Sequence, residues 1–266
     1  WSANLLAWLM DGLQAISACP WATISIAARP DWAWVAAFGG SLLLITPRGL
    51  PGRWLGLPLL LPLGLLAPPA PALGEAWLQL LDVGQGLSAV VRTTHHTLVF
   101  DTGPTFLGGF NTGEAVLVPY LREQGLNRID TLILSHGDQD HAGGFAGLAG
   151  KVPIDRILAG ESPEHRAGLR LESCLAGQGW NWDGVDFRVL HPPRAGLRGN
   201  DSSCVLRLAT QGASLLLVGD LGQVPEKQLA RHANLAATLL VAGHHGSNNS
   251  SSTEFLAAVA PSWVLY

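Results

Sequence analysis

The segment from Ser135 to Gly144, SHGDQDHAGG, concentrates two histidines and two aspartates in one turn. The residues before it, Thr131 to Leu134, are apolar or β-branched and too few for a helix, which predicts a short buried strand. Imidazole and carboxylate ligands without thiolate suit zinc, manganese or iron. A turn of this kind can aim its side chains at two neighbouring points, so we expect two metal ions rather than a solvated polar loop. The expected ligands from this turn are His136, Asp138, Asp140 and His141.

The chain divides into two parts by composition. Before Gly74 the only charged residues are Asp11, Arg29, Asp31, Arg48 and Arg53. Residues 1–74 therefore predict a membrane segment, and residues 75–266 predict a globular domain large enough for its own core. The Pro-rich stretch 67–74, APPAPALG, is the expected linker between them.

Two apolar runs in the first part predict transmembrane helices at about 31–47 and 53–68. They read WAWVAAFGGSLLLIT and WLGLPLLLPLGLLA, and neither leaves a polar face for water. Tryptophans near their ends suit the membrane interface. Each run is shorter than the roughly 20 residues that a span needs, so buried core helices are the alternative. Residues 1–28 predict an interfacial helix or a fragment of a larger membrane unit.

The turn between the two runs carries Arg48 and Arg53 and no acidic residue. Positive charge favours the cytoplasmic side, which would place everything after the second run on the outer side of the cell membrane. The sequence begins on Trp rather than Met, which we interpret as an excerpt from a longer chain. Trp263 to Tyr266 predict a strand at which the domain is cut off.

Charge and cysteine content limit the function classes. A net charge of −4 gives no bulk electrostatic indication of nucleic-acid binding, although cations at the expected ligands would offset part of it. The spacing of Cys19, Cys174 and Cys204 fits no zinc motif. We expect buried free thiols rather than a Cys174–Cys204 bridge.

Strand-like segments alternate with helical ones from Trp77 onward. Residues 77–82, 87–91 and 97–101 predict linked strands, and Thr112 to Gln124 predict a helix. Later strands, at 214–218 and 238–242, predict an α/β sandwich. Asp101, Asp220 and the pair His244-His245 each follow one of these strands. Because strand ends at one edge of a sheet converge, we expect them to share one site with the 135–144 turn.

At these residues the chain resembles the metallo-β-lactamase-like superfamily, whose fold is an αββα sandwich. The resemblance narrows to the carboxyl-terminal domain of the ComEC family of competence proteins and covers about Trp77 to Tyr266. It rests on an ordered set of motifs: LDVGQG at 81–86, FDTG at 100–103, VPYL at 118–121, the 135–144 turn, NDSS at 200–203, GD at 219–220 and HHGS at 244–247.

The resemblance implies a pair of divalent metal ions, Mn or Zn. His136, Asp138 and Asp201 would hold the first ion. Asp140, His141 and His244 would hold the second, with Asp220 as the bridge. His245 would then protonate the leaving oxygen or contact phosphate, although the two adjacent histidines could exchange these roles. Asp82 and Asp101 would orient ligands, while Asn200 and Ser247 would contact the substrate.

The chain departs from the family pattern at several positions. Leu87 stands where an acid usually follows Gly-Gln-Gly, and Asp138 stands where a second histidine is usual. The histidine usual near Asn200 is absent, so either Asp201 replaces it or the first site lacks one ligand. His191 is the other candidate, although its Pro-rich loop favours a structural role.

The resemblance implies hydrolysis of DNA phosphodiester bonds during natural transformation, with degradation of the strand that is not taken up. The implied partners are DNA, the membrane, other DNA-uptake proteins and a second copy of the chain. The implied location is the inner membrane, with the hydrolase domain on the periplasmic or extracellular side. The alternatives are another hydrolase of this fold, acting on a lactone or a lipid phosphodiester, and a non-catalytic module that guides DNA.

Overall fold

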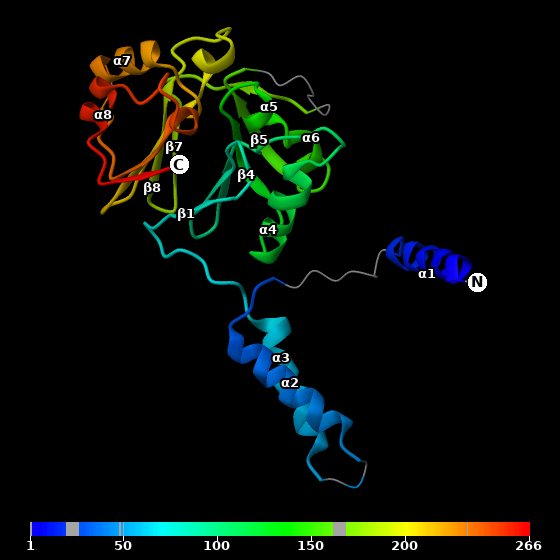
Figure 1. Cartoon of the computed structure of the whole chain (residues 1–266). Helices are drawn as coiled ribbons and strands as arrows, with labels where there is room; N and C mark the ends of the chain where they lie inside the picture. Colours follow the sequence, from blue (N-terminus) through cyan, green and yellow to red (C-terminus); the bar gives the residue numbers. More distant parts are fainter. Residues whose placement is uncertain (1, 20–26, 48, 50, 162–168, 233) are drawn as a thin grey trace. The chain divides into compact units, whose positions relative to one another are not determined.

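The chain forms two compact units, which are described separately here (Figure 1). One contains Trp1–Pro68 with Arg122–Gly125, and the other contains Pro69–Leu121 with Leu126–Tyr266. The computed structural model describes residues 2–19, 27–47, 49, 51–161, 169–232 and 234–266.

The first unit consists of short helices. They are α1 (Ser2–Ser17), α2 (Asp31–Ile45), the 3₁₀ turn η1 (Arg53–Leu55) and α3 (Gly56–Leu65). Helices α2 and α3 pack closely because each places a glycine at the contact. A Cβ atom on Gly40 would lie 2.6 Å from the carbonyl oxygen of Gly56, so a larger residue would push the helices apart.

The helices at the two expected spans are shorter than the sequence predicts. Helix α2 has 15 residues and α3 has 10. Thr46, which precedes Pro47, is extended with ψ 151°, and this ends α2. In the described part of the chain, every helix is too short or too polar to cross a membrane, so the two predicted spans are not confirmed.

The second unit contains two six-stranded sheets. The first has the order β1 (Trp77–Leu80), β2 (Ala89–Arg92), β3 (Thr97–Phe100), β4 (Ile129–Leu134), β5 (Ile154–Ala159) and β6 (Glu172–Ser173). The second has the order β12 (Trp263–Leu265), β11 (Leu239–Val241), β10 (Ser214–Leu217), β9 (Val205–Ala209), β8 (Val185–His191) and β7 (Gly179–Trp182). In both sheets hairpin-linked antiparallel strands lead into parallel ones, such as β3 beside β4 and β10 beside β11.

Helices cover the outer face of each sheet. The first sheet carries the π-turn η2 (Gly113–Leu117), α4 (Val118–Glu123), α5 (Gln139–Ala142) and α6 (Phe145–Leu148). The second carries α7 (Gln223–His232) and α8 (Thr253–Val259), and the 3₁₀ turns η3 (Gly199–Ser202) and η4 (Gly243–Gly246) follow β8 and β11 along the chain. The helix expected from Thr112 to Gln124 is therefore present as η2 and α4.

The burial of successive side chains explains this layering. In β3, Phe100 packs between the sheets while Val99 packs under the helices, because successive residues of a strand point to opposite faces. In β10, Leu217 packs between the sheets and Leu216 packs under α7 and α8. Strands apolar on both faces need a layer on each side, so the αββα sandwich predicted from the sequence is confirmed.

A disulfide crosses the core between the two sheets. Cys174 follows β6 and Cys204 precedes β9, and their Cα atoms are 6.1 Å apart. The expectation of free thiols at these positions is therefore wrong. The two cysteines are 30 residues apart in the sequence, and nothing in that spacing indicates that the two sheets bring them together. Cys19 is free.

Candidate metal centre

The turn after β4 places both of its histidines in the protein interior. His136 and His141 are fully buried, and their rings lie 4.3 Å apart between centroids. The Nε2 atom of His136 lies 3.5 Å from Oδ2 of Asp138, which is mostly exposed. The short helix α5 then carries Asp140 and His141, so one turn presents two imidazoles and two carboxylates, as the sequence predicts.

Asp101, at the end of β3, holds this turn from the neighbouring strand. Its carboxylate accepts hydrogen bonds from the backbone N–H of Ser135 at 2.6 Å and from the Ser135 hydroxyl at 2.7 Å. Oδ2 of Asp101 also lies 2.7 Å from Nδ1 of His141. The Ser135 hydroxyl in turn lies 2.9 Å from Nδ1 of His136. Both rings are therefore anchored through Nδ1 and present Nε2 to the site.

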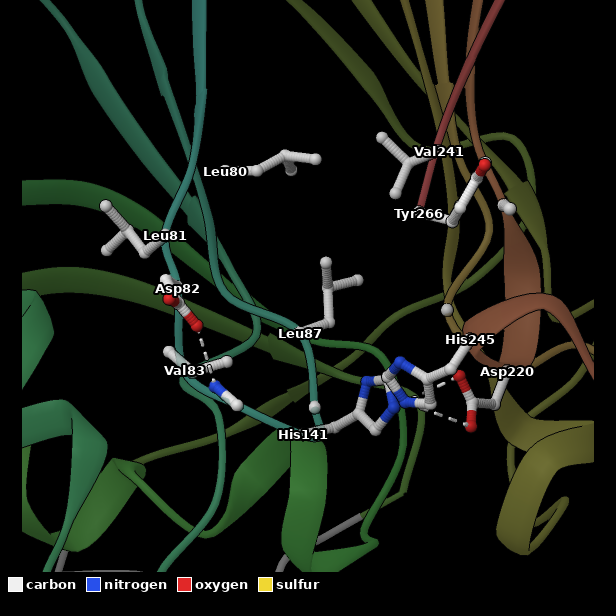
Figure 2. Close-up of a pocket in the computed structure, with 14 residues that line it drawn as sticks. Leu80, Leu81, Asp82, Val83, Leu87, His141, Asp220, Val241, His245 and Tyr266 are labelled. Atoms are coloured by element: carbon white, nitrogen blue, oxygen red, sulfur yellow. Dashed lines mark hydrogen bonds and ion pairs between the residues drawn. The ribbon is translucent and has the colours of Figure 1, made fainter.

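The second sheet contributes Asp220, after β10, and His245, after β11. Oδ1 of Asp220 lies 3.1 Å from Nε2 of His141, and its Oδ2 lies 3.9 Å from Nε2 of His245. Nε2 of His245 also lies 3.4 Å from Oδ2 of Asp140. Figure 2 shows His141, Asp220 and His245 turned toward one another across the gap between the sheets. The expected convergence of strand ends from both sheets is thus present.

These side chains form two groups that could each hold a metal ion. One contains Asp140, His141, Asp220 and His245, and the other contains His136, Asp138 and Asp140. Within each group the ligand atoms lie within 4.8 Å of one another, and Asp140 belongs to both. Two cations side by side could therefore share this carboxylate.

The electrostatics of the cluster favour cations. Burial and the neighbouring His141 lower the pKa of His136. Although burial opposes its protonated form, the carboxylates of Asp101 and Asp220 raise the pKa of His141 to about 10. His245 lowers the pKa of Asp140 to about 2, so this carboxylate is ionised at neutral pH.

Two buried nitrogen atoms test whether a metal fits here. Nε2 of His136 is buried without a hydrogen-bond partner, which is costly for a polar atom, and the buried Nε2 of His141 has the carboxylate of Asp220 as its neighbour, at 3.1 Å. Both face carboxylate oxygens. Nitrogen and oxygen donors of this kind suit zinc, manganese or iron, so the residues present fit divalent cations.

Several expected site residues lie outside the two groups. The side chain of His244 belongs to neither group, and its Nδ1 lies 3.3 Å from Nδ2 of Asn200, so His245 rather than His244 is among the candidate ligands. Asp201 is exposed on η3 and belongs to neither group, so the expected replacement ligand is not brought to the cluster. Ser247 accepts a hydrogen bond from the backbone N–H of Asn249.

Two other residues have structural contacts. The Nδ1 atom of His191 lies 2.9 Å from the carbonyl oxygen of Ser203, in keeping with the structural role favoured by its loop. Asp82 accepts a hydrogen bond from the backbone N–H of Gly84 at 3.2 Å and touches no candidate ligand, so its placement differs from that of Asp101.

A cavity of about 320 Å³ opens beside the cluster. His141, Asp220 and His245 line one side of it, and Leu80, Leu87 and Val241 line the other (Figure 2). Leu87 makes part of this wall apolar. The candidate metal centre therefore borders a space with one charged side and one hydrophobic side.

Glu226 in α7 is a residue that sequence reasoning missed. Its carboxylate is fully buried and accepts hydrogen bonds from the backbone N–H groups of Ser251, at 2.7 Å, and Ser252, at 2.8 Å. Gln223, in the same turn of α7, donates to the carbonyl oxygen of Asn248 at 2.7 Å. Helix α7 thus fixes the segment that follows His245. The partners of Glu226 are backbone atoms, so no pattern of side chains in the sequence could have indicated that it holds this segment.

One known protein resembles this chain along its whole length, and others resemble about two thirds of it. It is 42% identical over 268 residues to "Competence protein ComA" of Neisseria gonorrhoeae, covering 100% of this chain and 36% of that protein. It is 35% identical over 182 residues to "Recombination protein 2" of Haemophilus influenzae, covering 68% and 23%. It is 31% identical over 214 residues to "ComE operon protein 3" of Bacillus subtilis, covering 70% and 27%. The chain therefore spans about a third or less of the length of these relatives.

A family model extends this result to the site. The model of the metallo-beta-lactamase superfamily matches residues 81–262, a range that holds every side chain of the two ligand groups. The sandwich, the cluster at its strand ends and the matched range agree, and the chain belongs to the metallo-β-lactamase superfamily.

Proposed function

We propose that this chain is the metal-dependent hydrolase part of a competence protein and that it cleaves phosphodiester bonds in DNA. The observation that carries the proposal is the membership of Asp140 in both ligand groups. Many enzymes that hydrolyse phosphodiesters bind the scissile phosphate with two metal ions. The competence proteins among its relatives point to DNA as the substrate.

The residues of the two groups have distinct parts in this proposal. His136 and Asp138 would hold one ion, while His141, Asp220 and His245 would hold the other, with Asp140 between them. Manganese and zinc both suit these donors. When bound, such ions stabilise negative charge and lower the pKa of coordinated water.

The remaining residues position these ligands and the substrate. Asp101 and Ser135 hold the two buried imidazoles with Nε2 toward the site. His244 lies on the same turn as His245 but outside both groups, beside Asn200. In this proposal His244 contacts the phosphate or protonates the leaving oxygen, and Asn200 orients its ring.

The biological part of the proposal is degradation of the strand that is not taken up during transformation. The proposed partners are DNA, other uptake proteins and a second copy of the chain. Residues 1–68 would supply the contact with the membrane. Large apolar side chains cover the surfaces of α2 and α3, among them Trp34, Phe38, Leu57 and Leu61. Such surfaces suit a lipid environment.

The membrane arrangement has a direct test in cells. We expect an Arg53→Cys variant to react with a thiol reagent only from the cytoplasm. A Leu73→Cys variant should react with the reagent from the outer side of the cell membrane, because Leu73 lies in the linker before the hydrolase unit. The natural Cys19 is replaced by serine in both variants. Labelling of both positions from the same side would contradict the proposed topology.

The catalytic proposal is tested with the full chain loaded with manganese or zinc. We expect hydrolysis of end-labelled DNA, and an Asp220→Asn variant that binds DNA but no longer cleaves it. Turnover of nitrocefin or an acyl lactone without DNA cleavage would indicate another hydrolase of this fold. DNA binding with no metal-dependent cleavage would indicate a guiding module.

A further inference from the structure

The loop between β3 and η2 exposes large apolar side chains beside the metal centre. We call residues 105–111 the aromatic loop. Phe106 is 43% exposed and Phe110 is 54% exposed, and the intervening Leu107 is fully exposed. The two phenyl rings contact each other, with centroids 5.8 Å apart and planes inclined by 49°. A contiguous apolar tip of this kind marks a binding surface.

The aromatic loop is fixed at its base to the helix that carries His141. The side-chain amide of Asn111 donates to the Thr105 hydroxyl at 2.7 Å and to the carbonyl oxygen of Gly143 at 3.1 Å. The Thr105 hydroxyl donates to the same carbonyl at 2.6 Å. Gly143 is two residues after His141, so the candidate ligand and the loop share one short support.

The tip of the loop leans toward the cavity beside the cluster. A Cβ atom on Gly84 would lie 3.8 Å from Cζ of Phe106, and Gly84 lines that cavity together with His141 and Asp220. The wall opposite the charged side is apolar, with Leu80 and Leu87 (Figure 2). A ligand in this cavity therefore meets candidate metal ligands on one side and apolar side chains on the other, and Phe106 lies beside it at Gly84.

From this placement we propose that Phe106 and Phe110 stack on an unpaired nucleobase next to the phosphate held at the metal centre. This inference rests on the proposed nuclease function and refines it, because a base within a duplex is already stacked and cannot offer its face. Aromatic side chains bind the bases of single strands in this way without sequence preference. The site would therefore take single strands or frayed ends in preference to continuous duplex.

The test uses one end-labelled single strand that contains a run of abasic nucleotides between normal flanks. The wild-type chain, loaded with manganese, should cleave linkages in the flanks about 10-fold more often than linkages in the abasic run. A Phe106→Ala/Phe110→Ala variant should cleave both regions about equally. A Phe106→Trp variant should keep the preference, because it restores a stacking surface. Trp77→Ala is the matched control, since Trp77 is an aromatic residue 44% exposed on β1.

The outcomes separate this inference from the proposed function. If the wild type cleaves the flanks and the abasic run equally often, the stacking inference is wrong while the nuclease proposal stands. If it cleaves no DNA, the nuclease proposal fails, and a strand that carries 2-aminopurine then decides the inference. The fluorescence of that base must change on binding to the wild type, and this change must be lost in the double alanine variant.

A lipid surface is the other chemistry that could cover this tip. If the double alanine variant loses binding to phosphatidylcholine vesicles but keeps the preference for normal flanks, the aromatic loop is a membrane contact and the stacking proposal is overturned.

Discussion

Oδ2 of Asp101 lies 2.7 Å from Nδ1 of His141, and both side chains are fully buried. Asp101 reaches this position with a φ of 60°, a backbone conformation that is unfavourable for most residues other than glycine. The contact fixes the His141 ring and turns Nε2 toward Asp220. Strained backbone at a buried carboxylate is a feature that recurs at functional sites.

The first prediction concerns this contact. An Asp101→Asn variant should bind manganese or zinc about 10- to 100-fold more weakly, because an amide orients the imidazole less well and lowers its basicity. Competition with a chromophoric chelator measures the affinity. Asp82→Asn is the matched control, since Asp82 bonds only the backbone of Gly84 among described groups. Equal affinities for both variants would show that Asp101 does not act through His141.

The second prediction concerns metal removal. Nε2 of His136 is buried without a hydrogen-bond partner, and nearby carboxylates repel one another unless cations are bound. A chelator should therefore lower the thermal midpoint of the full chain, and manganese or zinc should restore it. At a hundredfold excess over the dissociation constant, binding stabilises by about 2.7 kcal/mol.

The matched variant for metal removal is Asp220→Asn, which lacks one charged ligand. Its midpoint should respond less to the chelator than that of the wild type. A wild-type midpoint that does not change on chelation, at a metal concentration where binding is measured directly, would contradict the cluster as a metal site.

The sequence predicts the sandwich and most of the cluster because both depend on local patterns. Apolar residues on both faces of β3 and β10 require covering layers, and acids that follow those strands must meet at the strand ends. The turn from Ser135 to His141 is similarly local. The separation of His244 from His245 is not predictable, because adjacent residues with φ of 50° in η4 point in directions that only the folded turn determines.

Contacts between residues far apart in the sequence are the other features that could not be predicted. Asp201 carries the right side chain but lies on an exposed turn, outside the two ligand groups. Cys174 and Cys204 meet only because two sheets pack face to face. Helix α2 ends at Ile45, before Thr46-Pro47, and α3 ends at Leu65, and hydrophobicity alone does not indicate either end.

The third prediction concerns Glu226. A Glu226→Gln variant removes a buried charge that accepts two backbone N–H groups, and it adds an amide donor without an evident acceptor. We expect a loss of about 1–3 kcal/mol in the free energy of unfolding, measured with urea. Glu254→Gln is the control, because Glu254 is exposed and pairs with Lys227 across the surface. Similar losses in both variants would mean that the buried contacts contribute little.

The last prediction concerns acid stability at Asp183, in the turn between β7 and β8. Its carboxylate accepts a hydrogen bond from the Thr93 hydroxyl at 2.6 Å and from the backbone N–H of His95 at 2.8 Å. Nδ1 of His95 and Nδ1 of His96 lie 2.9 Å and 3.2 Å from it. The contact therefore ties the turn between β2 and β3 in one sheet to a turn in the other.

These contacts determine how stability depends on pH. Although burial opposes its ionised form, the bonds from Thr93 and His95 hold the pKa of Asp183 well below its usual range. A carboxyl whose pKa is lower in the folded state stabilises the fold above its unfolded pKa of about 3.9, and this contribution is lost as the pH falls below that value. An Asp183→Asn variant should lose this part of the acid dependence. Asparagine before Gly184 keeps the two-residue turn, so the substitution removes the charge without disturbing the backbone.

The measurement is the free energy of unfolding from about pH 6 down to pH 3, with a chelator present so that metal release does not contribute. The wild type should be more stable than the Asp183→Asn variant at pH 6, and the difference should begin to shrink below about pH 4 without vanishing at about pH 3, because the folded pKa lies lower still. Asp186→Asn is the matched control, because Asp186 is exposed on β8 and is held by the side chain of Asn181. If the wild-type and Asp183→Asn curves run parallel over this range, the carboxylate does not tie the two sheets together through its charge.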